Sequence, residues 1–178
     1  MDACHFACAP RFRLRHTVAL RIEMIVRNAH PEDVSACVEL VEARRRRYET
    51  FEPRFWKKAA NSKDSSKSWF SHLFSDSGTV SIVAAKDPHI LGFLIGCEIQ
   101  VPPVYEPGGR TVLVDDFCVA EGQWADVGAS LLAAAKQEFH ERGFVQLVVV
   151  GARLDLEKSA FLETTDLSLA STWWTGPT

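Results

Sequence analysis

The segment that decides the fold is residues 112–132, VLVDDFCVAEGQWADVGASLL. Residues 112–119 are mostly aliphatic or aromatic, as in a β-strand, and the small and polar residues 121–126 follow as a turn. From Val127 the apolar residues recur at helical spacing through Leu131, Leu132 and Phe139. A strand that leads directly into a helix leaves the first N–H groups of that helix without acceptors, at the positive end of its dipole. The segment therefore predicts a site for an anionic group, such as the phosphates of a cofactor.

Length, composition and charge indicate a globular protein and exclude several classes of partner. The chain has 178 residues, of which 47% are hydrophobic and 24% charged, and this suffices for one core. A formal net charge of -3 gives no basic footprint for nucleic acid, and no apolar run approaches the roughly 20 residues that span a bilayer. Five cysteines without a disulfide framework indicate a reducing compartment, so we expect a cytoplasmic protein without nucleic-acid or membrane partners.

The chain is expected to consist of a loosely ordered N-terminal extension, residues 1–23, and a single domain, residues 24–178. The extension contains Cys4, His5 and Cys8, which have the side chains of a metal site. No second pair of ligands lies nearby, and the histidines are scattered without metal spacing, so we predict no metal site.

The remaining patterns predict alternating strands and helices. Strands are expected at residues 24–27, 79–85, 90–101, 112–119, 144–150 and 169–174, and helices at residues 31–47, 69–74, 127–142 and 158–165. The continuous apolar run 144–150 is typical of a central strand that is covered on both faces. Gly92 and Gly96 mark a bulge or the close approach of another backbone. The arginines at 44–47 are interpreted as a solvated helix end that complements the dipole, or alternatively as a patch for phosphate or an acidic substrate.

Two motifs resemble those of the GNAT acetyltransferase superfamily. The strand VDDFCV (114–119), followed by Gln123-x-x-Asp126-x-Gly128, resembles the family's pyrophosphate loop, Arg/Gln-x-x-Gly-x-Gly/Ala after an apolar-acid-acid-apolar-x-Val strand. Asp126 stands where the family usually has glycine, and Trp124 where another glycine is common. The tail AFLETTDL (160–167) is similar to the family's Ala-x-Tyr-Glu-x-x-Gly-Phe, and the order of elements is also the GNAT order.

The resemblance implies an α+β GNAT fold, with a mixed, mostly antiparallel central sheet flanked by helices. It implies acetyl-CoA as co-substrate, bound in a V-shaped opening between strands 112–119 and 144–150. The end of the first strand would pair with the pantetheine amides, and main-chain N–H groups of the loop would hold the pyrophosphate. It further implies an amine acceptor, either a small molecule or a protein, and a homodimer. The cofactor-binding residues would be Phe117, Cys118, Val119, Gln123, Trp124, Ala125, Asp126, Val127, Gly128, Ala129 and Asp155.

The candidate catalytic residues are Asp115 and Asp116, because acids are unusual in an otherwise apolar strand. Transfer of an acyl group to an amine requires a neutral amine, and a positioned carboxylate can remove its proton. Because successive side chains of a strand point to opposite faces, one acid is expected to face the cleft and the other to pair with an arginine or the main chain. Asp126, if it does not repel the phosphates, is expected to cap the following helix.

Leu162 stands where the family often has a tyrosine that protonates the departing thiolate. Leucine cannot do this, so water or another group serves, or no acid is needed, or the protein binds acyl-CoA or another ligand without transfer. The aromatic residues between 48 and 70 either line the acceptor pocket or pack in the core. A doubly wound nucleotide-binding domain is disfavoured, because residues 79–119 contain three successive strands without a crossover helix.

Overall fold

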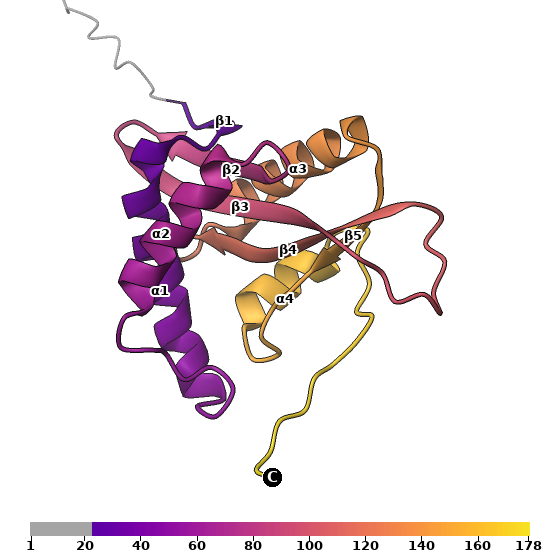
Figure 1. Cartoon of the computed structure of the whole chain (residues 1–178). Helices are drawn as coiled ribbons and strands as arrows, with labels where there is room; N and C mark the ends of the chain where they lie inside the picture. Colours follow the sequence, from indigo (N-terminus) through magenta and orange to yellow (C-terminus); the bar gives the residue numbers. More distant parts are fainter. Residues whose placement is uncertain (1–22) are drawn as a thin grey trace, which may run out of the picture.

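A computed structural model describes residues 23–178. Its elements follow one another along a single sheet with helices on both faces (Figure 1). The strands are β1 (Ile25–Asn28), β2 (Val80–Lys86), β3 (His89–Ile99), β4 (Arg110–Val119) and β5 (Phe144–Val149). The helices are α1 (Val34–Phe51), α2 (Ser62–Ser75), α3 (Ala129–Glu141) and α4 (Leu156–Glu163), with a 3-10 turn at Pro31–Asp33 and a π-helical turn at Trp124–Gly128. The expected extension, except Glu23, lies outside the described residues.

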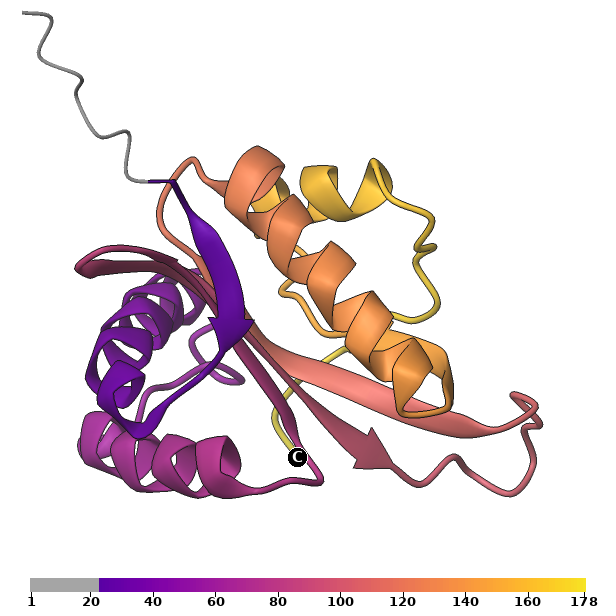
Figure 2. The same cartoon turned by 90° about the horizontal axis from the view of Figure 1, so that it is seen from above.

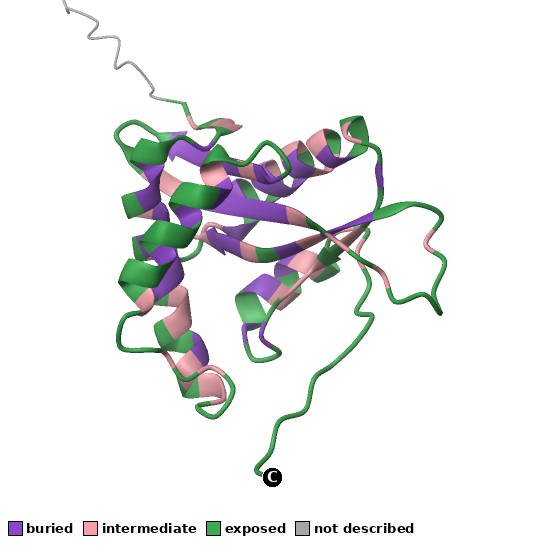
Figure 3. Ribbon diagram, in the orientation of Figure 1, coloured by how far each residue is buried: buried purple, intermediate pink, exposed green. Residues whose placement is uncertain are grey.

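The sheet is mixed and mostly antiparallel, which confirms the predicted fold class. The strand order is β1-β2-β3-β4-β5; the first four strands pair antiparallel, and β5 pairs parallel with β4. Helices α1 and α2 cover one face, and α3 crosses the other (Figure 2). Apolar side chains fill both interfaces, which is why the inner surfaces of the layers are buried (Figure 3). Among residues 23–178, no helix is both long and apolar enough to cross a membrane.

A bulge in β4 separates the parallel pairing with β5 from the opening beyond it. Ile95 of β3 pairs with Asp116, and Cys97 pairs with Leu113, so two β4 residues stand opposite Gly96 alone. The pairing of β4 with β5 ends at Val114 and Val149, where β5 itself ends, and beyond this point the Nζ of Lys158 lies between the carbonyls of Phe117 and Val150, so the two segments part. The sequence-based interpretation of the glycines is confirmed: a Cβ on Gly92 would lie 2.9 Å from the carbonyl oxygen of Cys118, and Gly96 sits at the bulge.

Two predictions about the C-terminal part are wrong. Strand β5 is not central but lies at the edge of the sheet, with Val145 58% exposed. Residues 169–174 form no strand. Both errors have one cause, because the tail passes away from the free edge of β5 and leaves that edge without a further strand. The ring of Trp173 instead lies 6.0 Å from that of Phe55, beyond the end of α1.

Candidate active site

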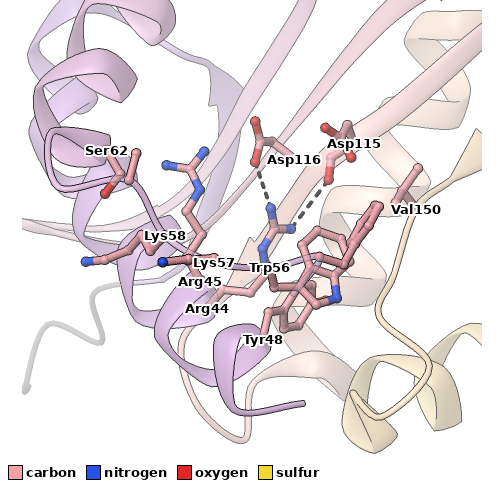
Figure 4. A pocket seen from close by; sticks show the side chains of 12 residues that line it. Arg44, Arg45, Tyr48, Trp56, Lys57, Lys58, Ser62, Asp115, Asp116 and Val150 are labelled. Carbon is pink, nitrogen blue, oxygen red and sulfur yellow. Dashed lines mark hydrogen bonds and ion pairs between the residues drawn. The ribbon is translucent and has the colours of Figure 1, made fainter. Parts of the chain in front are cut away.

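The two acids of β4 have different surroundings. The side chain of Asp116 accepts a 2.8 Å hydrogen bond from Nη2 of Arg44, on the facing helix α1. Nη1 of Arg44 also donates to the carbonyl oxygen of Phe117 at 3.1 Å. It reaches that of Asp115 at 3.5 Å, as Figure 4 shows together with the bond to Asp116. The carboxylate of Asp115 is exposed and takes part in no ion pair among residues 23–178. The carboxylate of Asp115 can therefore contact a ligand, whereas that of Asp116 is paired with Arg44.

Arg44 is therefore neither a solvated helix end nor a free anion-binding group. Helix α1 continues to Phe51, a full turn past the predicted end, and this places Arg44 against the sheet. Burial opposes its charge, but Cys118 and Asp116 raise the pKa of Arg44 above the ordinary value, so the guanidinium stays charged. Its Nε is buried and has no hydrogen-bond partner among the described residues. One donor beside the opening is thus left unsatisfied.

A cavity of about 280 Å³ lies between the end of α1, the loop after it and β4. Its wall combines the aromatic side chains of Tyr48, Phe55 and Trp56 with the charged groups of Lys57 and Asp115 (Figure 4). The prediction that aromatic residues of this region line a pocket or enter the core holds for most of them but not for Trp69. Phe70 is fully buried in the core, and Trp69 is exposed.

The turn between β4 and α3 presents free main-chain donors. The N–H groups of Val127 and Gly128 donate to the carbonyl of Gln123, whereas those of Trp124, Ala125 and Asp126 find no main-chain acceptor among residues 23–178. These donors stand at the start of the π-helical turn that continues into α3. They fit an anionic group such as a pyrophosphate. The expected capping role of Asp126 is wrong, because Gln123 occupies the N-cap position and Asp126 lies exposed within the first turn.

Trp124 and Gly128 are explained by packing against each other. The indole of Trp124 turns into the core and stacks on Phe161 at 5.4 Å, so it leaves the outer side of the turn open. A Cβ on Gly128 would lie 2.9 Å from this indole. Any larger residue at 128 must therefore displace Trp124, and a substitution there tests packing as much as ligand binding.

Asp155 caps helix α4 and is buried. Its carboxylate accepts a 2.8 Å hydrogen bond from the hydroxyl of Tyr48 and a 3.4 Å bond from the N–H of Lys158, and Nη2 of Arg47 lies at 3.4 Å. Burial raises the pKa of the Tyr48 hydroxyl far above its ordinary value. These contacts tie the end of α1 to the start of α4, on the cavity side of the opening.

Lys158, which sequence reasoning did not consider, occupies the opening between the strands. It is 1% exposed, and its Nζ donates to the carbonyl oxygens of Val150 at 2.6 Å and Phe117 at 3.4 Å. The signal that could have found it is its position four residues before Leu162 and three before Phe161, on the apolar face of α4. Within residues 23–178, no cluster of side chains could hold a metal ion.

Comparisons with known proteins agree with the architecture. No family model matches the sequence, and no curated protein matches it significantly. Solved structures do match. A ribosomal-protein-alanine N-acetyltransferase from Brucella melitensis biovar Abortus is 16% identical with a TM-score of 0.61, covering 88% of this chain and 99% of its own. A predicted acetyltransferase from Clostridium acetobutylicum, solved with acetyl-CoA, is 17% identical with a TM-score of 0.66, covering 87% and 96%.

An aminoglycoside N-acetyltransferase in complex with CoA is 11% identical with a TM-score of 0.66, covering 90% of this chain and 98% of its own. At such identities the matches establish the fold alone. The chain has the GNAT fold of acyl-CoA N-acyltransferases, and this confirms at the level of the fold the resemblance found in the sequence.

Proposed function

We propose that the protein is an N-acetyltransferase that transfers the acetyl group of acetyl-CoA to an amine of a small molecule or a protein. One observation carries the proposal: the strands β4 and β5 part beside a cavity that holds an unpaired carboxylate, that of Asp115. Parted strands offer main-chain groups to an extended ligand, and the cavity offers a place for an amine next to a base.

The residues present fit acetyl-CoA. The free N–H groups of Trp124, Ala125 and Asp126 would hold its pyrophosphate, and the main chain of Phe117–Val119 would line the pantetheine arm. When bound, acetyl-CoA supplies an acyl group activated as a thioester. Asp115 would bind an acceptor ammonium, orient it and take up its proton. Tyr48, Phe55 and Trp56 would shield the amine from water and favour a cation at their ring faces.

The test compares two neighbouring carboxylates. Isothermal calorimetry with acetyl-CoA on the full chain is followed by a transfer assay with a panel of small-molecule amines and N-terminal peptides. Asp115→Asn is expected to keep acetyl-CoA affinity and lose rate by roughly 10²- to 10⁴-fold, the usual contribution of a general base. Asp116→Asn is the matched control, which weakens the bond to Arg44 and is expected to lower stability more than Asp115→Asn. Equal rates for wild type and Asp115→Asn contradict the assignment.

A second function, binding of acyl-CoA or another ligand without transfer, is favoured by a specific observation. The carbonyl of Phe117, which a pantetheine amide would use, already accepts hydrogen bonds from Arg44 and Lys158. Binding of acetyl-CoA without transfer to any amine of the panel, and without slow hydrolysis, supports this alternative and contradicts the first.

Two further expectations belong to this proposal. The free edge of β5, where Val145 and Val148 are exposed, offers a surface for the expected homodimer, and sedimentation velocity across concentrations tests it. The free thiols of Cys37, Cys97 and Cys118 are compatible with a reducing, cytoplasmic compartment.

A further inference from the structure

Lys158 is a buried cation without an anionic partner. Its Nζ takes part in none of the ion pairs found among residues 23–178, and its hydrogen-bond acceptors are the main-chain carbonyls of Phe117 and Val150. An ammonium has three donors, so one N–H remains without an acceptor in the described part of the chain. The rings of Phe117 and Trp124 lie 5.5 and 5.7 Å from Nζ and provide weak cation–π contacts. A buried charge that contacts only carbonyl dipoles and aromatic rings is unfavourable. The folded chain nevertheless keeps this charge at the fork, the point where β4 and β5 part.

The position of Lys158 links it to the cavity. The carbonyl of Phe117 accepts hydrogen bonds from both Lys158 and Arg44, and Val150, the other acceptor, lines the cavity wall. Lys158 therefore reaches the fork from α4, opposite the side on which α1 presents Arg44. No other lysine of the described residues bonds to either strand at this point. An extended ligand that enters between the strands must meet this ammonium.

The other titratable groups at the opening cannot readily release a proton near neutral pH. The guanidinium of Arg44 has a raised pKa, and burial raises the pKa of the Cys118 thiol to about 11. The hydroxyl of Tyr48 is also held protonated by burial and donates to Asp155. In contrast, burial and the charge of Arg44 lower the pKa of Lys158 to about 7. The charged and titratable groups that act on Lys158 are Arg44 on α1, Asp116 and Cys118 on β4, and Asp155 at the start of α4.

We propose that Lys158 is the general acid of the transfer reaction and gives the proton that the departing thiolate takes up; this rests on the proposed function. As the acceptor nitrogen bonds to the acyl carbon, the carbon–sulfur bond breaks and sulfur keeps the electron pair. The proton on Nζ moves to that sulfur, which leaves a free thiol and a neutral amine on Lys158. The proton of the acceptor amine passes to Asp115 and then to solvent, and Lys158 takes a new proton from water.

The strength of the acid suits this step. An ordinary thiol has a pKa of about 8.5, so an ammonium that ionises near 7 can protonate a thiolate downhill. Such a group is also partly protonated at neutral pH, which is the condition for efficient general acid catalysis. An unperturbed lysine would hold its proton more tightly than the thiolate does. The desolvated position between the strands is therefore the feature that makes this side chain an acid.

The test uses three variants of the full chain. Lys158→Met removes the proton and keeps an unbranched apolar stem; Lys158→Arg keeps a cation that does not release its proton; Lys86→Met, at the exposed end of β2, is the matched control. Both changes at 158 are expected to lower kcat with acetyl-CoA by roughly 10²- to 10⁴-fold, while Lys86→Met is unchanged. With an acetyl thioester of an acidic aromatic thiol, whose thiolate leaves without a proton, the loss is expected to shrink by at least about tenfold.

Two measurements besides turnover complete the test. Calorimetry is expected to give acetyl-CoA affinities for wild type and Lys158→Met within about threefold. Lysine side-chain NMR of the free protein is expected to show one ammonium that titrates near pH 7 and is absent in Lys158→Met. Unchanged kcat in Lys158→Met, or a lysine that titrates at its ordinary pH, overturns the proposal. A rise in both the affinity for acetyl-CoA and kcat in Lys158→Met also overturns it, because the side chain of Lys158 would then only obstruct the opening. Failure of wild type to bind acetyl-CoA overturns the proposed function itself, and this proposal with it.

Discussion

The contact between α1 and the start of α2 and the opening between β4 and β5 each contain a buried charge, but the partners of the two charges differ. Glu42 on α1 is 2% exposed and accepts hydrogen bonds from Lys58 at 2.8 Å, Ser62 at 2.9 Å and Arg45 at 3.2 Å. Lys158 is 1% exposed and meets only carbonyls and rings. Although burial opposes the charge of Glu42, its hydrogen bonds lower the pKa of Glu42, whereas the surroundings of Lys158 move its pKa against its charge. The partners of Glu42 stabilise its charged form and join neighbouring elements of the fold. Lys158 has no anionic partner and therefore loses its proton more easily than an ordinary lysine.

The largest expected effect on the free energy of unfolding is at Glu42, the buried charge that has partners of opposite charge. Glu42→Gln removes the anion that holds Lys58 and Arg45 between α1 and α2, and both cations then lose their partner. We expect a loss of about 2–4 kcal/mol in the free energy of unfolding, because breaking a largely buried ion pair exposes its desolvation penalty. Urea unfolding followed by circular dichroism measures it. Glu39→Gln, on an exposed stretch of the same helix, is the matched control and should change little. Equal losses in the free energy of unfolding for Glu42→Gln and Glu39→Gln would contradict a special contribution of the buried carboxylate.

Lys158→Met is expected to act in the opposite direction. Replacing a buried, unpaired ammonium by an apolar chain of similar length removes a desolvation penalty and should raise the free energy of unfolding by about 1–3 kcal/mol. The same urea experiment measures this change. A loss of stability comparable with that of Glu42→Gln would mean that the bonds of Nζ to Phe117 and Val150 clamp the strands and outweigh the penalty.

The pH dependence of stability sharpens the comparison. In the unfolded chain Lys158 keeps its proton up to its ordinary pKa of 10.5, whereas in the folded chain it loses that proton above about pH 7. The unfolded state therefore binds more protons between these values, so this group makes stability rise with pH, by at most about 1.4 kcal/mol per pH unit. Buried thiols such as Cys118, with ordinary pKa 9.0 and raised values in the fold, act oppositely above about pH 9.

The measurement is therefore made between pH 7 and pH 9. The free energy of unfolding of wild type should increase relative to that of Lys158→Met as the pH rises through this window. Parallel curves for the two proteins would contradict a depressed lysine pKa.

The smallest effect concerns a charge that is exposed. Asp126 lies at the start of the π-helical turn, among the free N–H groups that would hold pyrophosphate. Asp126→Gly removes a repulsive carboxylate and is expected to tighten acetyl-CoA binding about two- to fivefold, since solvent screens exposed charges. Calorimetry at two salt concentrations measures it, with Glu121→Gln as control. Weaker binding in Asp126→Gly would show that the carboxylate orders the turn.

The sequence predicted what local patterns determine and missed what long-range contacts determine. The strand, turn and helix of residues 112–132 and the GNAT order of elements follow from periodicity and motif. The edge position of β5 and the missing strand at 169–174 depend on where the tail goes, which no local pattern encodes. Arg44 was placed in solvent and Lys158 was not considered, for a shared reason: long cationic side chains on helices normally reach water, and only the packing of α1 and α4 against the sheet removes them from it here.

The most direct test of the central claim is lysine side-chain NMR of the full chain, titrated with acetyl-CoA. We expect one lysine resonance that titrates near pH 7, disappears in Lys158→Met and shifts as acetyl-CoA is added. A Lys158 resonance that titrates near 10.5, or that does not move when acetyl-CoA is bound, would contradict it.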